Sequence, residues 1–213
     1  MKYIRLEDLI FRAAFCDPAS GKKEQIKRVR ARSAIVVVGA DVLSRFFVLH
    51  AWAERCSTDH LMDRIIEVND QWRPRVFGIE ANAMQSLFAD NVQREARYKE
   101  KSIPIVPVYQ PTTIDKDWRI RMTLQPVIAN GRLLLLASQH ELKVELVSFP
   151  MSATKDLVDA LASAIALIPG PVARRDQDEE MDARLAYLRE SGAPASYIEQ
   201  VIDEYELSGG SRR

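Results

Sequence analysis

The segment Ser33–Gly39 (SAIVVVG) constrains the fold more than any other part of the sequence, because it is almost continuously apolar and β-branched. Such a run is typical of a strand that is buried on both faces of a sheet. Strands are also expected over Ile10–Cys16 and Arg45–Trp52, and Asp17-Pro18 ends the first because proline cannot continue a central strand. The close succession of these three strands favours an antiparallel meander.

Beyond these strands, segments with helical spacing of apolar residues alternate with strand-like segments. This order predicts an α/β protein with a mixed central sheet, in which three antiparallel strands are followed by parallel strands, and with helices on both faces. Five helices are expected: one that begins at Ser57 or Thr58, three over Met84–Tyr98, Asp117–Leu124 and Ser138–Leu146, and one that begins at Thr154. The further expected strands are Arg75–Glu80, Ile105–Val108 and Arg132–Leu136.

Three of these helices carry an apolar face that is expected to point into the core. Ser57 or Thr58 is expected to cap the first helix, and Thr154 the last. The expected inner positions are Leu61, Ile65 and Val68 in the first, Leu87, Val92 and Ala96 in the helix over 84–98, and Leu157, Val158, Leu161, Ala162 and Ile165 after Thr154.

Pro169-Gly170-Pro171 marks a boundary, because these residues stop the preceding helix. We expect one domain over residues 1–169 and a charged helical tail, partly disordered, over residues 170–213. Two tail segments, Arg174–Glu190 and Pro194–Leu207, have apolar faces that favour docking to a partner over simple solvation.

Composition limits the possible functions. No run of eighteen apolar residues and no apolar leader after Met1 is present, so no membrane association is expected. Two cysteines, Cys16 and Cys56, are too few for a disulfide scaffold and favour a reducing compartment. The formal net charge of +0 argues against a protein that holds nucleic acid by bulk charge, although it allows a local basic surface.

Four carboxylates lie near the ends of expected elements: Asp17 and Glu80 after strands, and Asp156 and Asp159 in the first turns of the last helix. A spacing of three places the latter two on one helical face. Carboxylates at adjacent strand ends repel one another without a counter-charge, and hard divalent cations are the usual counter-charge for oxygen ligands. Asp17 is equally typical of a turn, and Asp156 of a helix N-terminus. Spacing alone therefore leaves a metal site and structural carboxylates both open.

Four segments follow one another in a recognisable order: Asp17-Pro18-Ala19 before a buried strand, Glu80-Ala81-Asn82 after RVFGI, Lys116-Asp117-Trp118-Arg119-Ile120, and TKDLVDAL over 154–161. In this order they resemble the nuclease domain of bacteriophage or prophage large terminase subunits, which belongs to the RNase H-like superfamily. The order and spacing match over residues 11–168, most of the chain.

The resemblance implies a metal-dependent endonuclease that cleaves double-stranded DNA during viral genome packaging, using two Mg²⁺ or Mn²⁺ ions. It implies that Asp17, Glu80, Asp156 and Asp159 are catalytic and bind the metal. It further implies an ATPase motor domain, a portal and a small terminase subunit as partners, and the cytoplasm of a host cell as the location.

The chain departs from the family pattern at Thr154-Lys155, where His-Asp is usual, so a cation replaces an acidic group. Asp156 is therefore the preferred third ligand, and Asp159 is an alternate ligand or lies behind it. Both are kept, because related Holliday-junction resolvases use two aspartates at this spacing. No G-x-x-x-x-G-K-[ST] phosphate loop occurs, so a nuclease domain separate from its motor is expected.

Basic residues near the acidic motifs are expected to contact DNA phosphates. Three alternative functions remain: a Holliday-junction resolvase, a ribonuclease H-type nuclease, or a non-catalytic docking module of the packaging motor. The expected DNA-binding residues are Lys22, Lys23, Arg28, Arg30, Lys116, Arg119 and Lys155.

Overall fold

The computed structural model describes residues 5–19, 32–81, 86–110 and 115–169, together with positions 185, 189, 195, 198–199 and 201–203. Contacts divide the chain into two units, Met1–Ile168 and Pro169–Arg213, which are considered separately. In the second unit the described residues after Pro169 are helical, and a small apolar cluster consists of Leu185, Ile198, Val201 and Ile202.

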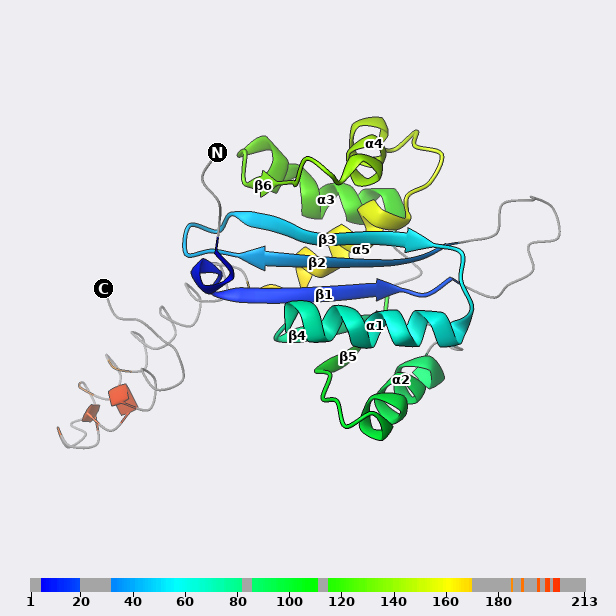
Figure 1. Ribbon diagram of the computed structural model, residues 1–213. Coiled ribbons are helices and arrows are strands. Elements are labelled where there is room, and N and C mark those ends of the chain that lie inside the picture. Colours follow the sequence, from blue (N-terminus) through cyan, green and yellow to red (C-terminus); the bar gives the residue numbers. More distant parts are fainter. Residues whose placement is uncertain are drawn as a thin grey trace. The chain divides into compact units, whose positions relative to one another are not determined.

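A mixed sheet of six strands forms the centre of the described part of the first unit (Figure 1). The order across the sheet is β5-β4-β1-β2-β3-β6. β1, β2 and β3 are antiparallel neighbours, whereas β4, β5 and β6 each run parallel to the strand beside them, which confirms the expected mixed sheet. The strands are β1 (Phe11–Asp17), β2 (Ser33–Ala40), β3 (Phe46–Glu54), β4 (Val76–Glu80), β5 (Ile105–Val108) and β6 (Leu133–Leu134).

The sheet is buried on both faces, and this explains the continuous apolar run in β2, where every residue is buried. Successive side chains of β1 enter opposite cores: Ala13 and Phe15 lie in one, Ala14 and Cys16 in the other. Each face therefore needs its own layer of helices.

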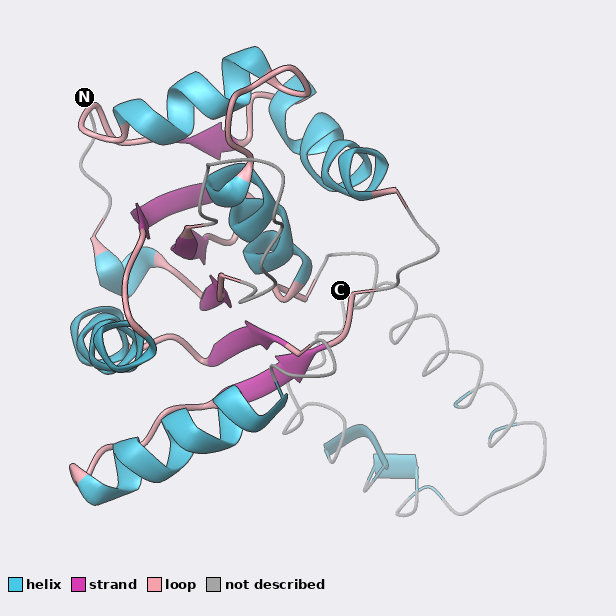
Figure 2. Ribbon diagram, turned by 90° about the vertical axis from the view of Figure 1, so that its right-hand side faces the viewer, coloured by secondary structure: helices cyan, strands magenta, loops and turns pink. Residues whose placement is uncertain are grey.

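Helices cover both faces, as expected (Figures 1 and 2). The core that contains Phe15 includes residues of α3 (Lys116–Ala129), α4 (His140–Ser148) and α5 (Asp156–Ala166). The opposite core is covered by α1 (Thr58–Trp72) and α2 (Ser86–Tyr98). α5 contacts β1 and β2 on one side and α3 and α4 on the other, so nearly its whole surface is buried.

Within the described residues, no helix has both the length and the apolar character needed to cross a membrane.

Two local expectations were wrong. Leu87 is 68% exposed, whereas Val92 and Ala96 are buried, because the inner face of α2 runs through Ala89 at the helical spacing of three and four. Thr154 does not cap α5, since the residue at the N-cap position is Lys155 and its side chain makes no capping hydrogen bond. By contrast, Ser57 caps α1 as expected, accepting a hydrogen bond from the His60 amide at 3.2 Å.

Candidate metal centre

The parallel pairing of β1 and β4 brings Asp17 and Glu80 together. Cys16 is paired with Ile79, and each carboxylate is the next residue and the last of its strand. Phe15, two residues before Asp17, lies in the core beneath α5. Because side chains alternate along a strand, Asp17 and its neighbour Glu80 lie on the face that α5 covers.

α5 supplies the third carboxylate, Asp159, whose side chain is only 3% exposed. A close approach between sheet and helix layer is possible because Gly78 has no side chain: an added Cβ would lie 2.6 Å from Leu167 Cδ1. One carboxylate oxygen each from Asp17, Glu80 and Asp159 lies within 4.8 Å of the others. Residues 17, 80 and 159 thus form one cluster, which we call the acidic triad.

Burial and repulsion within the acidic triad raise the pKa of Asp17 well above its usual value of 3.8. Burial is the largest cause, followed by the charge of Glu80, and the charge of Asp159 acts in the same direction. Lys116 opposes the shift without cancelling it. A site that resists its own ionisation in this way favours a bound cation as an additional counter-charge.

Two cations from the first turns of α3 face the triad. Lys116 Nζ lies 2.6 Å from Asp159 Oδ2, and an Arg119 nitrogen lies 2.5 Å from Asp159 Oδ1. Burial lowers the pKa of Lys116, but the neighbouring carboxylates outweigh it and raise the pKa above 10.5, so Lys116 is charged at neutral pH. Arg119 and Gln110 both donate to Ser163 Oγ at 3.2 Å, which fixes the guanidinium beside Asp159.

Asp156 is not part of the acidic triad, and the carboxylate that lies beside Asp17 and Glu80 is that of Asp159. The preference for Asp156 as the third ligand therefore stays a prediction, and the geometry favours Asp159, the alternate ligand. The Asp156 carboxylate accepts a hydrogen bond from Arg32 Nε at 3.0 Å. Residues three apart on a helix differ by about 60° in direction, which suffices to direct one carboxylate to the triad and the other to Arg32.

The remaining expected DNA contacts have different positions. Lys155 Nζ forms an ion pair with Asp117 at 2.6 Å and lies 5.7 Å from the centre of the Phe149 ring. Lys116 and Arg119 face the triad, as described above. The other four expected contacts, Lys22, Lys23, Arg28 and Arg30, lie outside the described residues.

Sequence reasoning assigned no role to Glu145 or Arg32, which lie close to the candidate site. Arg32 is 15% exposed and pairs with Glu141, Glu145 and Asp156. A signal for Glu145 was present, because it follows the buried Leu142 by three positions and therefore lies on the inner face of α4. A buried glutamate needs partners, but the sequence does not name them.

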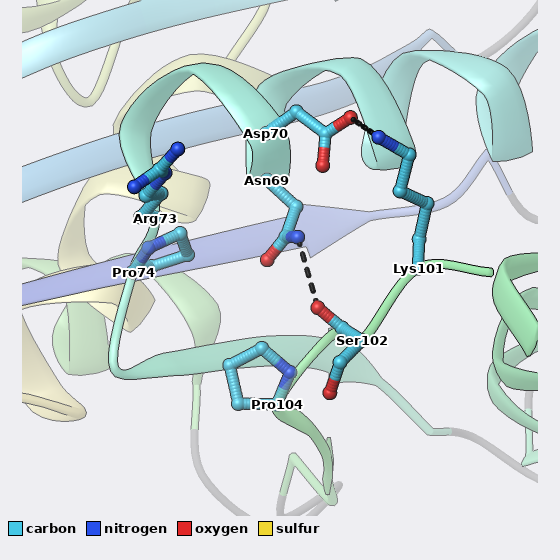
Figure 3. A pocket seen from close by; sticks show the side chains of 7 residues that line it. All are labelled: Asn69, Asp70, Arg73, Pro74, Lys101, Ser102 and Pro104. Atoms are coloured by element: carbon cyan, nitrogen blue, oxygen red, sulfur yellow. Dashed lines mark hydrogen bonds and ion pairs between the residues drawn. The ribbon is translucent and has the colours of Figure 1, made fainter.

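A pocket of about 460 Å³ (Figure 3) lies at the end of the sheet opposite to the acidic triad. Pro74 and Pro104, which precede β4 and β5, line it together with the C-terminal end of α1, whereas the triad lies where β1 and β4 end. Asn69 donates to the Ser102 carbonyl at 3.1 Å, and Lys101 pairs with Asp70 at 2.8 Å. These bonds join α1 to the segment before β5, so the polar residues that line the pocket have a structural role.

Comparison with known proteins identifies the fold. The sequence matches no protein-family model and no curated protein. Among solved structures, the large terminase nuclease domain of P22 is similar, with 12% identity, a TM-score of 0.51, and coverage of 73% of this chain and 79% of that one.

Two further structures have lower TM-scores. Thermus thermophilus RuvC in complex with a Holliday junction has 15% identity, a TM-score of 0.43, and coverage of 72% of this chain and 90% of that one. A mutant nuclease domain of the large terminase subunit of bacterial virus Sf6, with manganese and beta-thujaplicinol, has 9% identity, a TM-score of 0.49, and coverage of 76% and 90%. With the topology described above, the P22 match confirms the expected RNase H-like fold.

Proposed function

We propose that this chain is a metal-dependent endonuclease that cleaves double-stranded DNA during viral genome packaging. The main support is the convergence of Asp17, Glu80 and Asp159 from β1, β4 and α5, three segments that also carry the motifs resembling large terminases. The P22 nuclease domain, which shares the fold, is a large terminase domain.

The chemistry of the acidic triad fits Mg²⁺ or Mn²⁺. All of its donors are carboxylate oxygens, which hard divalent cations prefer. Burial, followed by the charge of Glu80, raises the pKa of Asp17, so a bound cation would favour the ionised form of this carboxyl. When two such ions are bound, they lower the pKa of an attacking water and stabilise the leaving oxygen of a phosphodiester.

The surrounding residues would prepare the site for an anionic substrate. Asp17, Glu80 and Asp159 would hold the ions, and Arg119, fixed by Ser163, would keep the Asp159 carboxylate in place. Lys116 is 48% exposed and charged, so its ammonium group could also contact a DNA phosphate.

The deciding experiment is cleavage of supercoiled plasmid by the full chain with Mg²⁺, Mn²⁺ or EDTA. We expect nicked and linear products with either metal and none with EDTA. Four-way junctions and RNA–DNA hybrids should be tested in parallel at equal concentrations. Preferential cutting of either would replace the proposed substrate with that of a resolvase or a ribonuclease H. Metal binding without any cleavage would favour a docking module.

The tail is expected to be dispensable for the chemistry. The acidic triad and the neighbouring Lys116 and Arg119 lie within the first unit of the chain, which ends at Ile168. A chain that ends near Gly170 should therefore retain metal-dependent plasmid cleavage within a few-fold of the full chain. The measurement compares cleavage rates of both chains after circular dichroism has shown that both are folded. A folded truncated chain without activity would contradict this boundary.

The basic residues between β1 and β2, Lys22, Lys23, Arg28 and Arg30, are expected to contribute to DNA binding. With a formal net charge of +0, affinity must come from local clusters, and each phosphate contact makes binding steeply dependent on salt. Neutralising Lys22, Lys23, Arg28 and Arg30 together should reduce cleavage about tenfold or more at limiting protein concentration and low salt. The cleavage that remains should depend less steeply on salt than that of the wild type, because fewer counterions are released on binding. Equal cleavage by variant and wild type across a salt titration would exclude the segment as a DNA contact.

A further inference from the structure

The first turn of α5 immediately precedes Asp159, and the first backbone amides of this turn have no acceptors within the helix. At a helix N-terminus the first N–H groups lack intrahelical partners and need others. The Asp159 amide already bonds to the Lys155 carbonyl at 3.0 Å, but the amides of Leu157 and Val158, just before it, are too early in the helix to do so.

Glu145 of α4 satisfies these two amides. Its Oε2 accepts hydrogen bonds from Leu157 N and Val158 N, both at 3.0 Å. Its Oε1 accepts a hydrogen bond from Thr154 Oγ1 at 2.7 Å and pairs with Arg32 at 2.9 Å. The carboxylate thus caps α5 from a neighbouring helix, and both of its oxygens are occupied.

The charge of Glu145 is compensated although its side chain is only 3% exposed. Arg32, which immediately precedes β2, lies between Glu145 and Asp156 and contacts both. One network therefore joins the start of β2, α4 and both ends of the Thr154–Asp156 segment. The first turn of α5 is held from outside the helix, one residue before Asp159.

We propose that Glu145 is a positioning residue for the candidate metal centre: by bonding the amides of Leu157 and Val158, it holds the first turn of α5 where Asp159 can bind metal together with Asp17 and Glu80. The inference rests on the proposed function only in treating the acidic triad as the metal site. Glu145 lies outside the terminase-like motifs and is distant in sequence from Asp17 and Glu80.

The test compares Glu145→Gln with Asp41→Asn in the full chain. Asp41 is a matched control, because it is also buried, accepts hydrogen bonds from two amides (Leu43 at 3.0 Å and Arg45 at 2.9 Å) and pairs with an arginine. It lies in the turn between β2 and β3, at the end of the sheet opposite the acidic triad. Both substitutions are expected to lower the melting temperature.

Only Glu145→Gln is expected to change metal binding. In glutamine one oxygen becomes an NH₂ group, which cannot accept a hydrogen bond from Thr154 or pair with Arg32. The side chain at position 145 is then no longer held in the position from which it bonds the amides of α5. Titration calorimetry with Mn²⁺, well below both melting temperatures, should show about tenfold weaker binding, as is usual when a group that orients a ligand is lost. Cleavage should fall at low Mn²⁺ and recover at high Mn²⁺, whereas Asp41→Asn should match wild type in both measurements.

Two results would overturn the proposal: unchanged Mn²⁺ affinity in Glu145→Gln, or an equal loss of affinity in Asp41→Asn. Should Glu145→Gln not fold, Thr154→Val replaces it, since it removes one hydrogen bond to Glu145 at nearly constant volume. A two- to threefold loss of Mn²⁺ affinity is expected there, and no loss would contradict the proposal. Because Mn²⁺ binding is read without DNA, a wild type that binds Mn²⁺ but cuts no DNA would refute the proposed function while leaving this inference testable.

Discussion

An Asp17→Asn variant is expected to lose metal-dependent cleavage by roughly a thousandfold or more, because a neutral amide in the middle of the triad removes several kcal/mol of metal-based stabilisation of the transition state. Asparagine keeps the size of the side chain, so the fold should persist. The measurements are plasmid cleavage in Mn²⁺ and the circular dichroism spectrum. A variant that is folded and retains wild-type activity would remove Asp17 from the site.

The same substitution should raise the melting temperature of the metal-free protein at neutral pH. The pKa of Asp17 is raised above its unfolded value of 3.8, so the folded state binds the proton more tightly. The metal-free wild type therefore loses stability as pH rises from 3.8 through the raised folded pKa, and this loss is complete above it. The difference in melting temperature between the variant and the wild type should be largest above the folded pKa of Asp17. It should vanish at pH values well below the unfolded pKa. A variant less stable than wild type at neutral pH would show a structural role for Asp17.

The second large effect is a difference between substitutions of two aspartates in α5, Asp156 and Asp159. Asp159→Asn should abolish cleavage, because it removes a ligand of the triad. It should also destabilise the metal-free protein by about 1–3 kcal/mol, since Lys116 and Arg119 lose a buried charged partner. Asp156→Asn is the matched variant, three residues earlier in the same turn. It should retain cleavage within a few-fold, because an asparagine oxygen can still accept from Arg32 Nε.

Both variants should be assayed with Mn²⁺ at saturating and limiting concentrations, beside urea denaturation to obtain the free energy of unfolding. Loss of activity in Asp156→Asn with full activity in Asp159→Asn would reverse the assignment and restore Asp156 as the ligand. Equal loss in both would mean that the first turn of α5 acts as a unit.

The motif order and the apolar patterning determined much of this protein. The β-branched run of β2 predicted a strand buried on both faces, and the positions of Asp17 and Glu80 predicted that both carboxylates lie where strands end. These features are local, because alternation along a strand and spacing along a helix depend only on neighbouring residues. The same local logic found the apolar side of α5 but failed for Leu87, which lies in the first turn of α2.

Tertiary structure decided which residues meet. The sequence placed Asp156 and Asp159 on one face of α5, and only the rotation of that helix against β1 and β4 directs Asp159 to the triad and Asp156 to Arg32. Glu145 and its partner amides lie in different elements, so no local pattern names the bond between them. Such pairings are fixed by packing between distant segments, because a buried charge accepts whichever donors the fold brings within reach.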